Sequence, residues 1–247
     1  MRFHHILVSF SATVLFIPCV NAAVVTIGAA KDNTLYNDPN GALSNGAGEF
    51  FFAGNTVAGV VRRGLVMFDL SGIPTGSIIN NVTLTLHMSM TSTGATNVSL
   101  HTLLADWGEG TSDAPGGEGA GAPSTPGDAT WIHTFYSNSF WTSPGGDFTA
   151  AASATTSVNA VGFYSWSSAQ MAADVQQWVN PGGPAANFGW LLQGNEAANN
   201  TSKRFDTREN ATAGFRPALT IDFTPVPGPS ALMALMMGSV IRRRRRT

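Results

Sequence analysis

Cysteine is almost absent from this chain: its 247 residues include only Cys19, which lies in an N-terminal segment with the features of a signal peptide. Arg2 gives that segment a positive start, residues 6–20 are mostly apolar, and Val20-Asn21-Ala22 suits a cleavage site. Cleavage after Ala22 predicts an exported protein that has neither a disulfide nor a thiolate metal site. Pro18 precedes Cys19 where a lipoprotein signal needs a small residue, so we expect no lipid anchor there.

Basic residues are scarce in the expected mature part. The whole chain has 13 Lys and Arg against 15 Asp and Glu, but six of the basic residues, Arg2 and Arg242–Arg246, belong to the terminal segments. The remaining 7 basic and 15 acidic residues give a formal charge of −8, and no Lys or Arg occurs between Arg63 and Lys203. Because binding to phosphates needs clustered Lys and Arg, we expect no nucleic-acid partner.

Catalytic sequence motifs are missing as well. The chain has no HExxH zinc helix, no GxSxG nucleophile turn and no Gly-rich phosphate loop. His87 and His101 fall at polar positions of two predicted strands and could face each other as metal ligands, although a solvated pair is the commoner arrangement. Asp106, Glu109 and Asp113 could supply an acid and a base, but no apolar setting around them would tune a carboxyl group. We therefore expect a non-catalytic protein.

What the chain does contain is the alternation of half-buried strands. Apolar and polar residues alternate strictly over 82–90 and again over 98–104 after a turn, which predicts a hairpin. One helix is expected at 168–179, because Ser167 or Ser168 can cap it and Met171, Val175 and Trp178 share one face. With Gly-rich connections between short strands, residues 23–224 are predicted to form an all-β domain, an antiparallel two-sheet β-sandwich with one short helix. Further strands are expected at 50–52, 64–70, 188–193 and 219–223.

A long acidic insert interrupts this pattern. Residues 105–146 are rich in Gly, Pro and Ser and contain no basic residue. Within the insert, residues 114–127 have no large apolar side chain, so we expect that stretch to stay unstructured. Trp107, Trp131 and Trp141 lie in these loops, where they could stack on sugar rings or pack as a cover over the edge of the sandwich. The sequence leaves both alternatives open.

Charged residues suggest two further binding sites. Arg63, Arg204 and Arg208 are the candidate contacts for an anionic glycan, with pairing to nearby carboxylates as the alternative. Asp32 and Asp222 would meet if the first and last strands were neighbours, and carboxylate oxygens on bent loops suit a structural calcium ion. No other cofactor is expected.

Several blocks of the mature region form a recognisable series. The blocks are RGLVMFDLS at 63–71, DWGEG at 106–110, NFGWLL at 187–192, RFDTREN at 204–210 and RPALTI at 216–221. Together they resemble the DNRLRE family of secreted bacterial proteins. The resemblance implies a jelly-roll β-sandwich and, as in some members, a carbohydrate-binding module for acidic polysaccharides such as alginate.

The C-terminal segment, residues 225–247, has three parts. Val226, Pro227 and Pro229 form a proline motif, and the apolar stretch after it ends at Ile241. Residues 225–241 are barely long enough to cross a bilayer, and a basic cluster stays on the cytoplasmic side. This order resembles the PEP-CTERM sorting signal, with Gly228 where the family usually has Glu, and implies processing by an exosortase; a permanent tail anchor is the alternative. The basic cluster consists of Arg242, Arg243, Arg244, Arg245 and Arg246.

Together these features predict a non-catalytic, secreted or cell-surface β-sandwich protein, a structural component of the extracellular matrix that could also bind polysaccharide. Its expected partners are the inner membrane, which holds it transiently, the export and sorting machinery, and exopolysaccharide. The alternatives are a dedicated carbohydrate-binding module for an acidic polysaccharide and, last, a polysaccharide hydrolase or lyase.

Overall fold

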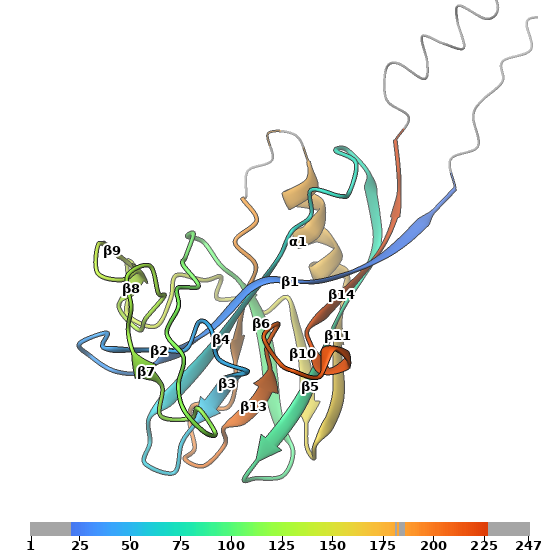
Figure 1. Cartoon of the computed structure of the whole chain (residues 1–247). Coiled ribbons are helices and arrows are strands. Elements are labelled where there is room, and N and C mark those ends of the chain that lie inside the picture. The colour runs from blue at the N-terminus through green and yellow to red at the C-terminus, as the bar shows by residue number, and fades with distance from the viewer. Residues whose placement is uncertain (1–20, 181, 183–185, 227–247) are drawn as a thin grey trace, which may run out of the picture.

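The computed structural model describes residues 21–180, 182 and 186–226 (Figure 1). Residues 1–20, most of the predicted signal peptide, and residues 227–247, which include Pro227, Pro229 and the arginine cluster, lie outside the described residues. Val226 is the last described residue and is exposed. Within the described part of the chain, no helix is both long and apolar enough to span a membrane.

The described residues form strands, one α-helix and one short 3-10 helix. The helices are α1 (Ala169–Val179) and η1 (Ala213–Phe215). The strands are β1 (Ala23–Tyr36), β2 (Leu43–Ser44), β3 (Phe50–Asn55), β4 (Val61–Phe68), β5 (Ile78–Thr91), β6 (Thr96–Thr102), β7 (Ala122–Pro123), β8 (His133–Phe135), β9 (Ser139–Phe140), β10 (Ala154–Val158), β11 (Gly162–Ser167), β12 (Trp190–Gln193), β13 (Lys203–Asp206) and β14 (Ala218–Thr224). This composition confirms the predicted all-β class with one short helix.

The strands form two antiparallel layers that are joined into a closed, barrel-like ring. The ring runs β1–β14–β5–β13–β3–β4 and returns to β1. The first half of β1 pairs with β14 and its second half with β4, and the register shifts between Ala29 and Lys31. Strand β11 extends one layer beside β5, whereas β12, β6 and β10 extend the other beyond β4. The predicted two-sheet arrangement is thus present, with β1 and β3 crossing between the sheets.

The predicted hairpin between β5 and β6 is wrong. Strand β6 pairs with β12 and β10, and β5 pairs with β14 and β13 along one edge and with β11 along the other. Since both edges of β5 are occupied, the turn after Thr91 carries the chain across to the opposite layer. The alternation identifies the buried side chains correctly from Val82 to Met88 and at Val98 and Leu100. It fails at Met90, which is 53 % exposed, and at Leu104, which is 60 % exposed and lies beyond the end of β6. Alternation also says nothing about which strand lies beside another.

The main core lies between the layers. Residues Leu84 and Leu86 of β5 point inward, fully buried, against Leu100 of β6 and Trp190 of β12. Trp166 of β11 is also fully buried, and its indole Nε1 donates a hydrogen bond of 2.8 Å to the carbonyl oxygen of Val98 in the other layer. Burial of large apolar side chains from both layers is the main source of stability in a domain without disulfides.

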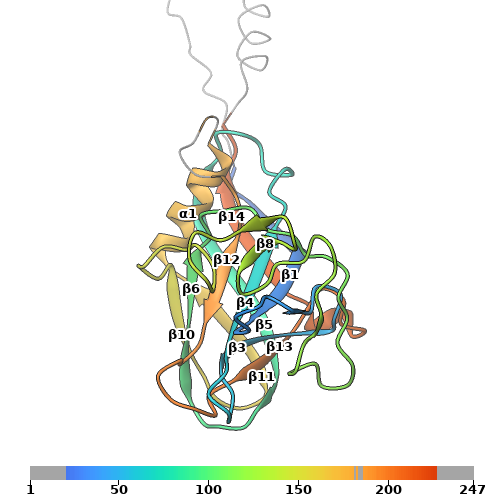
Figure 2. The same ribbon diagram turned by 90° about the vertical axis from the view of Figure 1, so that its left-hand side faces the viewer.

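Helix α1 covers the end of this core near the point where both described chain ends leave the molecule (Figure 2). It begins after Ser168, whose Oγ accepts a hydrogen bond of 3.0 Å from the backbone N–H of Met171, as an N-cap does. Met171 and Val175 are buried, and Trp178 packs against Trp190 with ring centroids 4.6 Å apart. The helix predicted at 168–179 is confirmed, with Ser168 as its cap.

A second core lies on the outer side of β4 and β12. Residues 105–147, which we call the lid, fold over this side and bury Trp107 and Trp141 against Leu65 and Leu191. In Figure 1 the lid contains β7, β8 and β9 on the side of the molecule away from β11. The insert is therefore a packed cover that gives this layer a second apolar face.

The prediction that residues 114–127 are unstructured is wrong. Glu118 is buried, and its carboxylate accepts hydrogen bonds from the backbone N–H groups of Glu49 and Phe50 and from Nδ2 of Asn45, at 2.7–3.0 Å. Its own carbonyl oxygen accepts from the Tyr36 hydroxyl at 2.9 Å. The segment lacks apolar anchors, but a buried carboxylate that satisfies backbone donors fixes it instead.

Replacing Glu118 by Ala should therefore release the middle of the lid. We expect a loss of about 1–3 kcal/mol of unfolding free energy, because two backbone donors and an amide lose their acceptor. Limited proteolysis should then cut within 114–127 sooner than in the unsubstituted protein. The control is Asp113→Ala, an exposed acid in the same segment. Equal cleavage rates for Glu118→Ala and the unsubstituted protein would contradict this assignment.

Removal of the helix cap gives a smaller effect. Ser168→Ala should lower the unfolding free energy by about 1 kcal/mol, a fall in Tm of about 2–4 °C, because the N–H of Met171 loses its acceptor. The comparison is with Ser157→Ala, at an exposed position of β10. If both variants melted at the same temperature, Ser168 would not be the cap.

Candidate functional site

The loop tryptophans predicted to contact a ligand are mostly turned inward. Trp107 is fully buried, and its indole Nε1 donates a hydrogen bond of 2.9 Å to the carbonyl oxygen of Phe188. Trp141 is 5 % exposed, and its Nε1 donates to the carbonyl oxygen of Thr130 at 2.9 Å. In this structure neither ring is available for stacking on a sugar, so both match the alternative in which they pack as a cover.

Trp131 is half-buried and belongs to a group of residues that surround the guanidinium of Arg63. The guanidinium of Arg63 lies 5.0 Å from the Trp131 ring centroid and makes two hydrogen bonds, of 2.8 and 2.9 Å, to the carboxylate of Glu196. Arg63 also donates to the carbonyl oxygen of Gly145 at 2.8 Å. All of these partners are within the chain, so Arg63 connects β4 to the lid and its charge is neutralised by Glu196.

The other two arginines predicted to contact a ligand, Arg204 and Arg208, also bond to residues of this chain. Arg204 places its guanidinium 3.7 Å from the Phe50 ring centroid and donates from Nε to Ser89 Oγ at 3.1 Å. Arg208 binds the carboxylates of Glu109 and Glu209. Pairing with carboxylates, the alternative weighed from the sequence, thus describes Arg63 and Arg208.

The predicted calcium pair is not brought together. Asp222 lies opposite Val24 in the first half of β1, and its Oδ1 accepts a hydrogen bond of 3.0 Å from Asn80. Asp32 lies in the second half of β1, opposite Val66 of β4. Eight residues of extended strand, roughly 25 Å, separate the two positions along β1. The first and last strands are neighbours as expected, but Asp222 lies opposite the first half of β1 whereas Asp32 lies in its second half.

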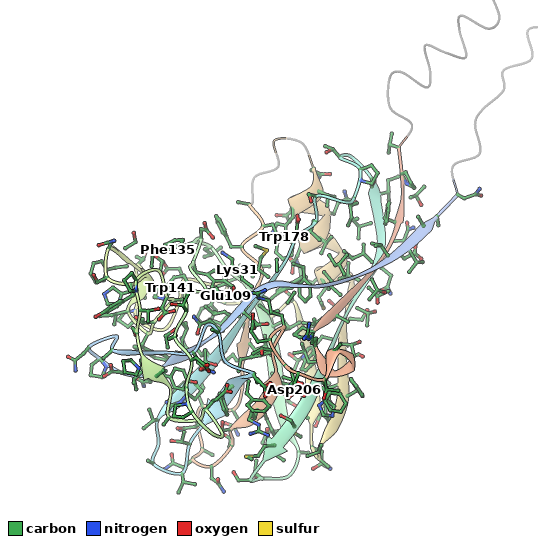
Figure 3. The ribbon with its side chains drawn as sticks, in the orientation of Figure 1. Lys31, Glu109, Phe135, Trp141, Trp178 and Asp206 are labelled. Carbon is green, nitrogen blue, oxygen red and sulfur yellow. The ribbon has the colours of Figure 1, made fainter. Side chains whose placement is uncertain are left out.

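Asp32 belongs instead to a cluster with Glu109 and Glu209, which we call the carboxylate cluster. One ligand oxygen of each residue lies within 4.8 Å of the others. Glu109 comes from the lid, and Glu209 follows β13. Figure 3 shows Glu109 beside β1, next to Lys31, which bonds to Asp106 at 2.8 Å rather than to the cluster.

Arg208 is the cation that faces these carboxylates. Its Nε and Nη2 donate to the two carboxylate oxygens of Glu109 at 2.7 and 2.6 Å, and its Nε lies 2.9 Å from Glu209 Oε1. Its backbone N–H donates to Asp32 Oδ2 at 2.9 Å, and the backbone N–H of Asp32 donates to Glu109 Oε1 at 2.9 Å. Three segments far apart in the sequence are therefore joined at this point.

The carboxylate cluster is electrostatically strained. Burial, reinforced by the nearby charges of Glu209 and Glu109, raises the pKa of Asp32 well above its usual value. Burial also raises the pKa of Glu209 to about 6, against the favourable effect of Arg208. The hydrogen bonds to Glu109 raise the pKa of Arg208. All three shifts arise where negative charge exceeds positive charge away from water.

The histidines do not form the predicted facing pair. His87 lies on the outer side of β5, where Nδ1 is 2.5 Å from Asp206 Oδ2 and the ring stacks on Phe215 at 3.9 Å. His101 belongs to the opposite layer and bonds to the carbonyl oxygen of Thr149 at 2.8 Å. Their separation follows from the assignment of β5 and β6 to different sheets.

A polar surface that was not predicted from the sequence covers the outer side of β1, β14, β5 and β11. In one row across these strands Thr26 lies opposite Thr220, Thr220 opposite Thr83, and Thr83 opposite Ser167. Each of these side chains is half-buried or exposed and carries a hydroxyl group. We call this surface the hydroxyl face and define it by Thr26, Thr83, Thr85, Ser165, Ser167 and Thr220.

Hydrogen bonds and an exposed ring complete the hydroxyl face. Thr26 bonds to Thr220 at 2.9 Å, and Thr85 to Ser165 at 3.0 Å, hydroxyl to hydroxyl. Phe163 follows next along β11, opposite His87, and is 56 % exposed. The signal for this surface was present in the polar half of the β5 alternation, where threonine occupies positions that could have held charged residues.

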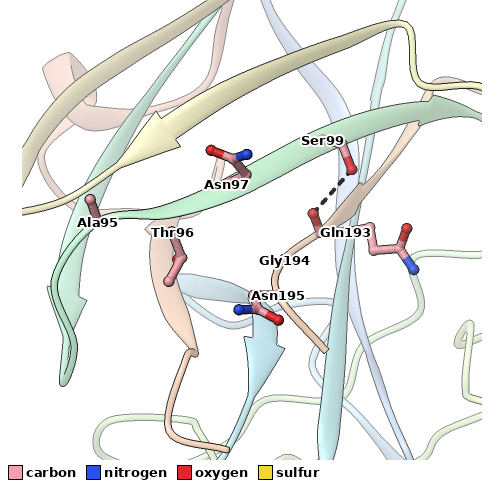
Figure 4. A pocket seen from close by; sticks show the side chains of 7 residues that line it. All are labelled: Ala95, Thr96, Asn97, Ser99, Gln193, Gly194 and Asn195. Carbon is pink, nitrogen blue, oxygen red and sulfur yellow. Dashed lines mark hydrogen bonds between the residues drawn. The ribbon is translucent and has the colours of Figure 1, made fainter. Parts of the chain in front are cut away.

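A shallow hollow of about 480 Å³ lies by β6 and β12 (Figure 4). Ser99 Oγ donates to the carbonyl oxygen of Gln193 at 3.3 Å across it. Its described lining is neutral and contains no carboxyl group or imidazole that could act as an acid or a base. The lining residues are Ala95, Thr96, Asn97, Ser99, Gln193, Gly194 and Asn195.

Comparison with known proteins adds no relative. No protein-family model matches the chain, and no curated protein is similar enough to count as a match. The DNRLRE and PEP-CTERM resemblances therefore stay predictions from the sequence blocks that carry them.

Proposed function

We propose that this chain is a non-catalytic, exported protein of the cell surface or matrix that binds a neutral polysaccharide on its hydroxyl face. The observation that carries the proposal is the row Thr26–Thr220–Thr83–Ser167, continued by Thr85 and Ser165. Neighbouring strands lie about 4.8 Å apart, so the face offers hydroxyl groups at regular intervals. A sugar chain presents hydroxyl groups at regular intervals too, and each group can donate and accept.

An exposed ring supports the same surface. Phe163 stands at the end of the hydroxyl face and is held by His87 and Phe215, with ring centroids 4.8 and 5.9 Å away. Aromatic rings bury large apolar area at little cost in conformational freedom, and the apolar side of a sugar ring is a suitable partner. Trp107 and Trp141, by contrast, are enclosed by the lid.

The charges favour a neutral ligand over an acidic one. The expected mature part has a formal charge of −8, and both Arg63 and Arg208 are paired with carboxylates. The six residues that define the hydroxyl face include no charged side chain. An anionic chain such as alginate would meet net repulsion, and Arg63 and Arg208 are already paired, so the acidic-polysaccharide alternative has less support.

A matrix role agrees with where the chain ends leave the domain. Ala23 lies opposite Phe223, so the described N-terminal end and the strand that leads to the C-terminal segment are side by side (Figure 1). The hydroxyl face runs along the same strands. A tether beyond Thr224 would hold the domain by one end and leave the sides of the sheets accessible.

Affinity gel electrophoresis of the exported protein tests this proposal. A neutral polysaccharide such as a soluble β-glucan or mannan should retard the unsubstituted protein. Phe163→Ala, and separately Thr83→Val with Thr220→Val, should weaken binding about tenfold or more, equal to about 1.4 kcal/mol. The losses are expected because the ring contact and the hydroxyl partners are removed.

The control variants make the same kinds of substitution at positions outside the hydroxyl face. Phe140→Ala removes another exposed ring, 4.6 Å from His133 in the lid, and Thr142→Val removes an exposed loop hydroxyl. Neither should change retardation. Binding that is insensitive to the Phe163 and threonine variants would move the ligand off this face. Retardation by alginate alone would favour the acidic-polysaccharide alternative.

A further inference from the structure

The carboxylate cluster is short of positive charge. Asp32, Glu109 and Glu209 bring three carboxylates together. The guanidinium of Arg208 bonds to Glu109 and Glu209, whereas Asp32 receives only the backbone N–H of Arg208. Lys31, on the neighbouring position of β1, is bonded to Asp106 and lies over the Trp107 ring at 4.4 Å. With all three carboxylates ionised, two negative charges remain at this point. An ion of charge +2 would cancel them.

Two oxygen atoms in the cluster have no hydrogen-bond partner among the described residues. Asp32 is 0 % exposed, and its Oδ1 is buried without a donor, whereas its Oδ2 accepts from Arg208. Glu209 Oε2 is likewise buried and without a donor. Buried acceptors are almost always satisfied, and a charged one that is not costs more than a neutral one. Both atoms are therefore buried acceptors that a bound cation could satisfy.

We propose that Asp32, Glu109 and Glu209 bind a calcium ion, with Asp32 Oδ1 and Glu209 Oε2 as its principal protein ligands. Calcium takes six to eight oxygen ligands at about 2.3–2.6 Å in flexible geometry. Three oxygens within 4.8 Å of one another can all reach one such ion. The donor set contains no imidazole or thiolate, which argues against zinc.

Arg208 positions Glu109 for this role without using up its acceptors. Both Glu109 oxygens already receive Arg208 donors, and Oε1 also receives the backbone N–H of Asp32. An ionised carboxylate has about four lone-pair sites, so one remains on Oε2. Asp32 and Glu209 supply the free oxygens, Glu109 adds a third, and water would complete the shell.

The ion would join three parts of the fold. Asp32 belongs to β1, Glu109 to the lid, and Glu209 to the segment that leads to η1. That segment ends in Phe215, which stacks on His87. The inference is independent of the proposed polysaccharide binding, because no member of the cluster belongs to the hydroxyl face.

Calcium titration of the exported protein, purified and stripped with a chelator, provides the test. Calorimetry should give one ion per chain. Calcium at about 100 times its Kd should raise Tm by roughly 5–10 °C, because the ion binds the folded state alone. Asp32→Asn and Glu209→Gln should each weaken calcium binding at least about tenfold and remove most of the Tm increase.

The matched control is Asp222, the other carboxylate that the sequence suggested as a calcium ligand. Asp222→Asn removes a carboxylate that bonds to Asn80 and lies outside the cluster, so calcium binding should be unchanged. Asp32→Asn should also melt no lower than the stripped unsubstituted protein, since it removes an uncompensated buried charge. If Asp32→Asn does not fold, Glu209→Gln at the partly exposed position gives the same readout.

Three results would overturn the assignment. They are a stripped protein that shows neither binding heat nor a Tm change with calcium, an equal response to magnesium, and loss of binding in Asp222→Asn but not in the cluster variants. Polysaccharide retardation measured with and without calcium separates this site from the proposed function, because either can fail while the other holds.

Discussion

The arrangement of the whole domain depends on how β1 crosses from one layer to the other. Its first half adds to β14 with alternate residues exposed, and after the register shift near Ala29 its second half adds to β4. There Asp32–Tyr36 are all buried, and Leu35 packs in the second core beneath the lid. A buried strand that contains Asp32, Asn33 and Thr34 must find partners for all its polar groups.

The lid supplies some of these partners, and β2 and β3 supply others. Asn33 Nδ2 donates to the carbonyl oxygen of Glu109, and its Oδ1 accepts from Ser44 Oγ at 3.1 Å. Thr34 Oγ1 accepts from the backbone N–H of Phe52. The lid is thus required by the polar sequence of β1 as much as by the apolar side of β4. Asp32 Oδ1 is a group that this arrangement leaves without a donor, and the proposed calcium site rests on that atom.

Local sequence patterns predicted the individual strands and the helix better than they predicted which strands pair with each other. The alternation over 82–88 and the capped helix after Ser168 are properties of nearby residues, and both are confirmed. The pairing of β6 with β12 depends on which edges of β5 are already occupied, and no local pattern contains that information. Likewise the order of residues 114–127 depends on one carboxylate, Glu118, whose partners lie about 70 positions earlier in the chain.

The candidate sites likewise combine features that the local sequence shows with features that depend on how distant segments meet. The polar positions of β5 could be read from the sequence. The hydroxyl face could not be predicted, because it depends on how β1, β14 and β11 align beside β5. Asp32 was a candidate metal ligand from the start, whereas Glu109 and Glu209 join it only because the lid and the segment after β13 meet at β1. The tryptophans were ambiguous for a related reason, since burial of a loop ring is decided by the chain that folds over it.

The side-by-side position of Ala23 and Phe223 has a mechanical consequence. A pull on the chain beyond Thr224 runs along β14, which is hydrogen-bonded to β1 on one side and to β5 on the other. If the opposing force acts on the same sheet, the two ladders are loaded in shear, and their hydrogen bonds must break together. A strand at the edge would instead peel away one bond at a time. The central position of the last strand therefore suits a domain that is held by its tail.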